Sequence, residues 1–171
     1  MDTHFPHEPS LEQVRRFLPG AQSSTYKNVL AKVASNQRIE GADERQMVEA
    51  LYDADIAEVQ TGICQIFMAL GEFGMTEDTA VVVCADHGDE LGEIGRTGHY
   101  TMNEWTLHTP LIVWTRRPVG GNMTVNDLTQ NADSFPTLAD PANIDIRSYR
   151  ADGRARAPDI RSQPEGQAAK A

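Results

Sequence analysis

The sequence has little positive charge, few cysteines and no long apolar run, and each shortage excludes a class of protein. Lysine occurs only three times, and 25 acidic against 15 basic residues give a formal net charge of -10. This charge argues against a nucleic-acid backbone or an anionic membrane as partner. The two cysteines, Cys64 and Cys84, are too few for a disulfide framework, and we expect both to be buried as small apolar side chains.

The sequence also lacks a charged-then-apolar leader and any apolar run long enough to cross a bilayer. We therefore expect a soluble, untargeted chain, and the sequence leaves its compartment, cytoplasmic or other, open. A chain of 171 residues fits one domain. Residues 145–171 are polar, with few apolar side chains, and are predicted to form a mostly disordered tail.

The most informative stretch is an apolar run at residues 80–85 that ends at Asp86-His87-Gly88. A run rich in β-branched valine predicts a central strand of a parallel sheet, buried on both faces. In open α/β sheets, ligands bind at the carboxyl ends of the strands. Two metal-ligating side chains beside a flexible glycine therefore indicate a candidate site. An ordinary strand-to-loop turn with a solvated acidic loop explains the same residues equally well.

The strongest helix pattern covers residues 43–72, where Asp43 and Gln46 have the capping-box spacing. Apolar residues in steps of three and four predict the face that packs on a sheet: Tyr52, Ile56, Val59, Ile63, Ile66 and Leu70. Three acidic residues lie off this stripe and are predicted to be solvated: Asp53, Asp55 and Glu58. A long helix, a short loop and a buried strand together form half of a βαβ unit.

The remaining elements are short. Ser10 and Gln13 have the spacing of a capping box at the start of a first helix. We further expect a loop with one helical turn at residues 21–41, a surface loop at 92–98, a short helix at 102–107, a second strand at 110–115, and a helix at 133–138 with Pro136 in its first turn. The predicted fold class is α/β, with a few-stranded, mostly parallel sheet (strands 79–85 and 110–115) and a long packed helix.

Four stretches, in order and at credible spacing, resemble motifs of the sulfatase family in the alkaline-phosphatase superfamily. They match the family's His-x-Pro, Tyr-Asp-Ala-Glu-Ile, Ser-Asp-His-Gly-Glu-x-Leu-Gly and Asp-x-x-Pro-Thr-Leu segments. In this chain they are His4-Phe5-Pro6, residues 52–59, residues 83–92 followed by Gly98-His99 and by residues 109–113, and residues 133–138. The resemblance implies that residues 1–144 form the C-terminal part of a sulfatase-like catalytic domain, a partial alkaline-phosphatase-like sandwich.

The resemblance implies a metal-dependent sulfuric ester hydrolase that acts on a sulfate-ester substrate. Asp86 and His87 correspond to metal ligands, with Ca²⁺ as the family's ion and Mn²⁺ left open by the imidazole. His4 and His99 correspond to catalytic residues that donate hydrogen bonds to the sulfate or the leaving group, although many members have Lys in place of His99. His7 and His108 are expected to be surface or structural histidines. Three further acids are reserve metal ligands: Asp89, Glu90 and Glu93.

The departures from the family pattern are equally informative. The sequence contains no Cys-x-Pro-x-Arg motif, whose Cys becomes the family's formylglycine nucleophile, and the early Asp-Asp metal pair is also missing. We therefore expect a fragment, a truncated gene or one half of a split protein that is inactive alone. Its expected partners are a missing N-terminal half, or further copies of itself that cover exposed apolar sheet. A phosphodiesterase or phosphonate hydrolase relative, or a non-catalytic remnant of the fold, are the alternatives.

Overall fold

The computed structural model describes residues 8–116 and 124–139, together with residues 142, 144–146, 149 and 152–155. His4, His7 and most of the predicted tail lie outside the described residues. The described chain forms two compact units. The first contains the residues up to Ala69 together with His87–Thr109, and the second contains Leu70–Asp86 and the residues from Pro110 onward.

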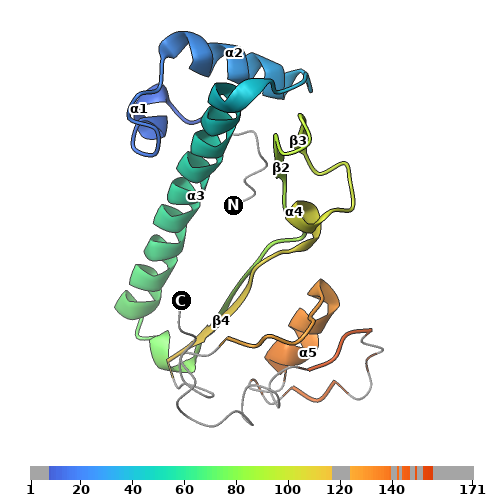
Figure 1. Ribbon diagram of the computed structural model, residues 1–171. Helices are drawn as coiled ribbons and strands as arrows, with labels where there is room; N and C mark the ends of the chain where they lie inside the picture. Colours follow the sequence, from blue (N-terminus) through green and yellow to red (C-terminus); the bar gives the residue numbers. More distant parts are fainter. Residues whose placement is uncertain are drawn as a thin grey trace. The chain divides into compact units, whose positions relative to one another are not determined.

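Three helices open the first unit: α1 (Leu11–Val14), α2 (Ser23–Ala34) and α3 (Gly41–Glu72) (Figure 1). The predicted capping box is confirmed, because Ser10 and Gln13 each accept a hydrogen bond from the backbone N–H of the other. The prediction of a loop with a single turn at residues 21–41 is wrong. Helix α2 forms there, because Val29 and Val33, which are about one helical turn apart, are buried in the core.

Helix α3 ends where the sequence predicts and begins two residues earlier, but its buried face is not the predicted one. The buried side chains of α3 are those of Met47, Val48, Ala50, Leu51, Ala54 and Asp55. Ile56 and Ile66, which belong to the predicted stripe, are 51% and 55% exposed. The helical period of the apolar residues in α3 fits two neighbouring faces. The face with the small alanines is the buried one, because small side chains allow other helices to pack closely. Asp55, predicted to be solvated, is buried.

The core of the first unit unites these three helices with the loops that follow them. Its buried members are Val14, Ala21, Val29, Val33, Ile39, Met47, Val48, Ala50, Leu51 and Ala54. Leu91 packs against this core from a distant part of the chain. Although α3 is 32 residues long, no helix among the described residues is apolar enough over a sufficient length to cross a membrane.

A small hairpin completes the first unit, where the sequence predicts only a surface loop at residues 92–98. Strand β2 (Glu90–Leu91) pairs antiparallel with β3 (Thr97–Gly98), with Glu90 opposite Gly98 and Leu91 opposite Thr97. Gly92 and Gly95, with φ of 101° and 77°, make the turn between them. The carbonyl of Gly95 accepts a hydrogen bond of 3.1 Å from the N–H of Ile39, which fastens the hairpin tip to the helices. The predicted short helix follows as α4 (Glu104–Leu107).

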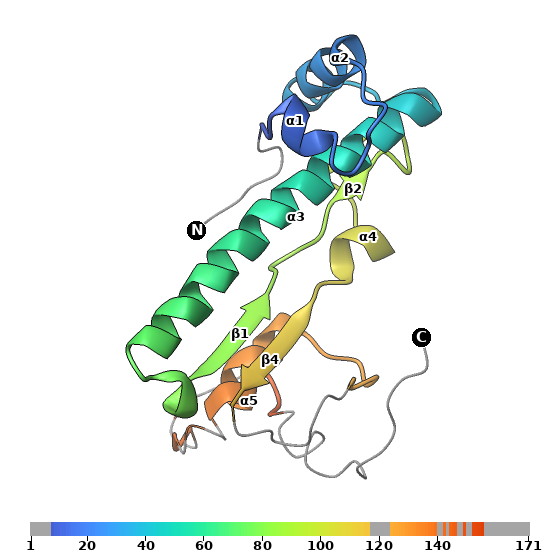
Figure 2. The ribbon, with the colours of Figure 1, turned by 90° about the vertical axis from the view of Figure 1, so that its left-hand side faces the viewer.

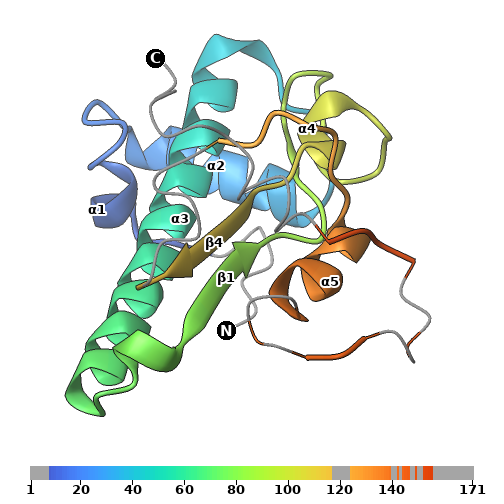
Figure 3. The same cartoon turned by 90° about the horizontal axis from the view of Figure 1, so that it is seen from below.

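The second unit contains strands β1 (Ala80–Cys84) and β4 (Leu111–Thr115), which confirm the two predicted strands. They form an antiparallel pair, with Ala80 opposite Thr115, so the prediction of a mostly parallel sheet is wrong for the described strands (Figures 2 and 3). Parallel neighbours need a crossover connection of a dozen or more residues, usually a helix, whereas the one helix in residues 85–110, all of them described, is the four-residue α4. The fold class, α/β with few strands and a long helix, is confirmed.

Burial in this strand pair differs from the expectation for a central strand. The three valines at the centre of β1 are half-buried rather than fully buried, because among the described residues β4 alone pairs with β1. Cys84 at its end is exposed, as is Cys64 on α3, so the prediction of two buried cysteines is wrong. Ile112 of β4 is 57% exposed, which leaves apolar surface on the ribbon.

The rest of the second unit supports the carboxyl end of β1. The 3-10 helix η1 (Thr76–Asp78) precedes β1, and η2 (Asn131–Asp133) leads into α5 (Ser134–Ala139), which confirms the predicted helix with Pro136 in its first turn. The Asn131 side-chain amide donates hydrogen bonds of 3.0 Å to the carbonyls of Ala85 and Asp86. These two hydrogen bonds hold the backbone of Ala85 and of Asp86, which is a predicted metal ligand.

Replacing Leu51 tests the observed buried face of α3. Leu51 is 0% exposed, so Leu51→Ala should lower the free energy of unfolding by about 2–5 kcal/mol through lost burial and the cavity that remains. Ile56→Ala, on the half-exposed stripe, should change it by no more than about 0.5 kcal/mol. Urea unfolding of the two variants measures both values. Equal losses would mean that the helix buries the predicted stripe instead.

Candidate functional site

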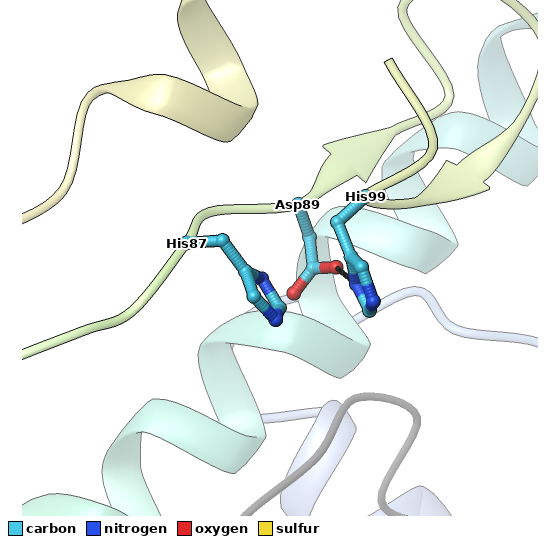
Figure 4. Close-up of side chains that lie close together, drawn as sticks. All are labelled: His87, Asp89 and His99. Atoms are coloured by element: carbon cyan, nitrogen blue, oxygen red, sulfur yellow. Dashed lines mark hydrogen bonds and ion pairs between the residues drawn. The ribbon is translucent and has the colours of Figure 1, made fainter. Parts of the chain in front are cut away.

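Three side chains in the first unit gather at the open end of the hairpin: His87, Asp89 and His99. One ligand atom from each lies within 4.8 Å of the others (Figure 4). The Asp89 side chain is 11% exposed and the His99 side chain is 37% exposed. The group therefore combines two imidazoles and one carboxylate at a partly open surface.

The register of the hairpin explains why Asp89 and His99 meet. Asp89 comes directly before β2 and His99 directly after β3, so the pairing of Glu90 with Gly98 makes these two residues the next facing pair. Their side chains make a contact of 3.1 Å between His99 Nδ1 and Asp89 Oδ1. The hairpin pairing thus brings together two residues that are ten positions apart in the chain.

His87 lies two residues before Asp89, and the two side chains point to the same side of the chain (Figure 4). The ring centroids of His87 and His99 are 3.9 Å apart, with an angle of 31° between the ring planes. His87 Nδ1 also lies 3.1 Å from the carbonyl oxygen of Gly88, so its tautomer is coupled to the local backbone. The two rings therefore share one small space.

Gly88, between His87 and Asp89, sets the path of this segment. Its N–H donates a hydrogen bond of 2.9 Å to the carbonyl of Thr106 in α4. A Cβ atom at this position would overlap the carbonyl oxygen of Trp105. Only glycine allows the backbone to approach α4 this closely, so Gly88 determines where the two neighbouring ligand groups are held.

Glu90 supports the segment that follows His99. Its side chain is 0% exposed, and Oε1 accepts hydrogen bonds from the Thr101 hydroxyl and, at 2.6 Å, from the Asn103 amide. Among the described residues, its second oxygen has no hydrogen-bond partner. Asn103 in turn caps α4 by accepting from the N–H of Thr106. Glu90, a reserve metal ligand in the sequence, is therefore buried beneath the site rather than among the three clustered groups.

The structure brings together two of the four predicted site residues. His87 and His99 lie in one cluster, whereas His4 lies outside the described residues. Asp86 is exposed and is the last residue of the second unit before the chain enters the first. The metal role of Asp86 and His87 and the catalytic role of His4 and His99 stay predictions. In the sequence Asp89 is only a reserve ligand, because the pairing of two-residue strands that brings it to His99 has almost no recognisable sequence pattern.

One further acid and one further histidine of this region, Glu93 and His108, have separate contacts. Glu93 Oε2 accepts a hydrogen bond of 2.6 Å from the N–H of Leu91, and Glu93 Oε1 lies 4.0 Å from the Arg45 guanidinium. His108 has an 82% exposed side chain, 3.6 Å from the Glu104 carboxylate, as expected of a surface histidine. Neither Glu93 nor His108 belongs to the cluster.

The negative charge of Asp89 reaches the neighbouring face of α3. Burial raises the pKa of the Tyr52 phenol above its usual value, and the charges of Asp89, Asp53 and Asp55 raise it further. Tyr52 is half-buried, so its phenol lies in a partly desolvated environment, in which the charge of Asp89 has a stronger effect on it. The tyrosine supplies a reporter of the charge at Asp89.

A family model and two curated relatives match this chain. The family model described as Sulfatase matches residues 1–144. Choline-sulfatase of Rhizobium meliloti (strain 1021) is 32% identical over 100 residues, which are 58% of this chain and 19% of that protein. Arylsulfatase K of Bos taurus is 28% identical over 103 residues, 60% of this chain and 19% of that protein. The chain thus spans about a fifth of the length of these curated relatives.

Two solved structures also resemble this chain over part of their own length. The phosphonate monoester hydrolase of Agrobacterium radiobacter matches with a TM-score of 0.64 and 29% identity, over 72% of this chain and 25% of that one. The phosphonate monoester hydrolase SpPMH from Silicibacter pomeroyi matches with a TM-score of 0.65 and 25% identity, over 93% of this chain and 31% of that one. The similarity covers most of this chain and a minority of each relative.

Adding one methyl group tests how Gly88 positions the cluster. Gly88→Ala should lower the free energy of unfolding by about 1–3 kcal/mol, because the new Cβ forces the segment away from α4. Gly71→Ala is the matched control: it lies within α3 with open space at its Cβ position, and should stabilise by about 0.4–1 kcal/mol. Denaturant unfolding of the two variants checks the opposite signs. A neutral Gly88→Ala would show that the close approach to Trp105 is not made.

Titration of Tyr52 tests the charge at the cluster. The pKa of Tyr52 should lie above the usual value of about 10, and Asp89→Asn should move it down by removing one repulsive charge. Because the pKa is raised in the folded state, the contribution of Tyr52 to stability is constant below about pH 10 and is lost as the pH rises through the folded pKa. Tyrosinate absorbance, with Tyr52→Phe subtracted, measures the shift. An unchanged titration in Asp89→Asn would contradict the proximity of the two groups.

Proposed function

Since this chain belongs to the sulfatase family, we propose that it contributes part of the active site of a metal-dependent sulfuric ester hydrolase. The observation that carries the proposal is the meeting of His87 and His99, whose ring centroids are 3.9 Å apart. The family resemblance assigns these two residues to one active site, as metal ligand and catalytic residue. The hairpin supplies a physical reason for them to meet there.

The proposed metal ligands are Asp86 and His87, which are adjacent in the chain after β1. A carboxylate oxygen and an imidazole nitrogen together suit a divalent ion, with Ca²⁺ favoured by the family and Mn²⁺ by the nitrogen donor. When bound, such an ion neutralises the anionic oxygens of the ester, which otherwise repel a nucleophile. Asp86 is exposed and His87 is half-buried, so both can be reached from solvent.

The proposed role of His99 is to donate a hydrogen bond to the sulfate or to the leaving-group oxygen, and His4 is proposed to act likewise. Asp89 orients the ring by its contact with Nδ1, which assigns Nε2 to the substrate. Asp89 is thus a positioning residue in this proposal.

The nucleophile has to come from elsewhere, because the sequence contains no Cys-x-Pro-x-Arg motif. We propose that turnover needs a segment bearing this motif, either as a separate partner or as another part of a longer protein. The half-exposed β1–β4 ribbon, with Ile112 on its surface, is proposed to pair with such a segment or with a second copy of the chain. Alone, the chain is proposed to be inactive.

A second candidate substrate is a phosphonate or phosphate ester. The two solved structures named above are phosphonate monoester hydrolases, and both cover more than two thirds of this chain. Sulfate and phosphonate monoesters place similar anionic oxygens around a tetrahedral centre, so the same metal and histidine donors serve both. A non-catalytic remnant of the fold is the remaining alternative.

An assay on two esters tests the function. The 171-residue chain, mixed with a sulfatase segment that carries formylglycine, should hydrolyse an aryl sulfate, and the chain alone should not. Asp86→Ala should abolish the regained turnover, since it removes the oxygen ligand, and His108→Ala should leave it unchanged. Running an aryl phosphonate in parallel shows which ester is preferred.

Three outcomes would contradict the proposal. Turnover by the purified chain alone would mean that it holds its own nucleophile. Full activity in Asp86→Ala would show that Asp86 is not a metal ligand of the active site. A stable complex with the formylglycine segment that turns over neither ester would favour a non-catalytic remnant.

A further inference from the structure

At the tip of the hairpin, a backbone contact brings two arginines together. The N–H of Ile39 donates a hydrogen bond of 3.1 Å to the carbonyl of Gly95. Arg38 directly precedes the donor residue, and Arg96 directly follows the acceptor residue. Both arginines line one pocket of about 270 Å³, to which Asn36 and Gly95 also contribute. The loop after α2 and the hairpin tip thus form one surface within the first unit.

The backbone on both sides of this pocket is held in place. The loop that carries Arg38 starts at the end of α2, where the N–H of Gln37 donates a hydrogen bond of 2.8 Å to the carbonyl of Lys32. Asn36, with a φ of 52°, makes the turn out of the helix. On the other side, a Cβ atom added at Gly95 would lie 3.3–3.4 Å from Nε, Cζ and Nη2 of Arg38. The Arg38 guanidinium therefore lies against the hairpin tip.

The two arginines have no counter-charge within the described part of the chain. Both are exposed, and neither forms a hydrogen bond or an ion pair with any described residue. The chain has 25 acidic and 15 basic residues, so acidic partners are abundant. Adjacent like charges repel each other, and an anion between them relieves that repulsion. Other basic side chains do have glutamate partners: Lys32 pairs with Glu44, Arg45 with Glu49, and Arg116 with Glu77.

We propose that Arg38, Arg96 and Asn36 form a binding site for a tetrahedral oxyanion with two negative charges, as in sulfate, phosphate or a phosphate monoester. Guanidinium groups bind such oxyanions through paired N–H donors, and the Asn36 amide adds a neutral donor. Two guanidinium charges match a dianion, whereas one carboxylate leaves one of them uncompensated. The pocket volume of about 270 Å³ lies below the roughly 300–1,000 Å³ of pockets for drug-sized ligands, so it suits a small anion.

This site uses none of the residues proposed for hydrolysis. His87 and His99 lie at the open end of the hairpin, whereas Arg96 lies in the turn between β2 and β3. The inference therefore does not rest on the proposed function. A chain without hydrolytic activity would bind the anion equally well.

Nuclear magnetic resonance of the labelled 171-residue chain, titrated with sodium sulfate, tests the site. We expect saturable shifts of the Nε–H groups of Arg38 and Arg96 and of the Asn36 side-chain amide. Arg116, which has Glu77 as its partner, should show no shift. Constant ionic strength, maintained with sodium chloride, separates binding from screening.

Three further anions define the ligand. Inorganic phosphate should bind as sulfate does, and acetate, a planar monoanion, should bind more weakly. A sugar phosphate separates the two sources of the group. If it binds as phosphate does, the site accepts an ester, and if it does not bind, the ligand is the free ion.

Substitution of each arginine gives the expected loss. Arg38→Gln and Arg96→Gln should each weaken sulfate binding, followed at the Asn36 amide, by more than about tenfold, since each removes hydrogen bonds to a charged group. Both side chains are exposed, so neither variant should unfold the chain, and circular dichroism checks this. Arg116→Gln is the matched control and should leave sulfate binding unchanged. His99→Gln should also leave the shifts at the two arginines unchanged.

Four results would overturn the site. They are shifts that do not saturate, sulfate affinity unchanged in both Arg38→Gln and Arg96→Gln, an equal loss of affinity in Arg116→Gln, and acetate binding as tight as that of sulfate. Loss of the arginine shifts in His99→Gln would likewise contradict the site, because the anion would then bind at the open end of the hairpin. None of these results depends on turnover, so this inference and the proposed function fail separately.

Discussion

The pairing of β2 with β3 is the constraint on which the candidate site depends. These strands have only two residues each, yet their register decides that Asp89 faces His99. A slip of one residue would send the side chains of one strand to the opposite face and separate the two groups. So short a pairing is weak alone, and it is held by the contact of Gly95 with Ile39 and by the packing of Leu91 on the core. The site therefore depends on the helical core of the first unit.

The sequence predicts the elements that have strong local signals. The valine run at β1, the long pattern of α3 and the capping box at Ser10 all form as expected. Each rests on interactions within a few residues, which a sequence displays directly. The family resemblance implies that His87 and His99 serve one site, which stays a prediction, and their ring centroids lie 3.9 Å apart.

Features set by distant contacts are those that the sequence does not predict. The buried face of α3 depends on α1 and α2, which select Leu51 over the equally periodic Ile56. The antiparallel pairing of β1 with β4 depends on the path of the intervening chain, since the same apolar run suits either orientation. Asp89 follows the same rule, because its partner is ten residues away across a hairpin that Gly92 and Gly95 permit. Glu90 is a reserve metal ligand in the sequence, and its burial depends on the polar groups of Thr101 and Asn103, which are distant in the chain.

The register of the hairpin is the central claim, and nuclear Overhauser effects between backbone protons measure it most directly. On the isotopically labelled chain we expect cross-strand effects between Leu91 and Thr97 and between Glu90 and Gly98. Side-chain effects between Asp89 and the His99 ring should accompany them. Direct αH–αH or NH–NH effects displaced by one residue, such as Leu91 to Gly98, or the absence of any cross-strand effect, would contradict the account of how the site is assembled.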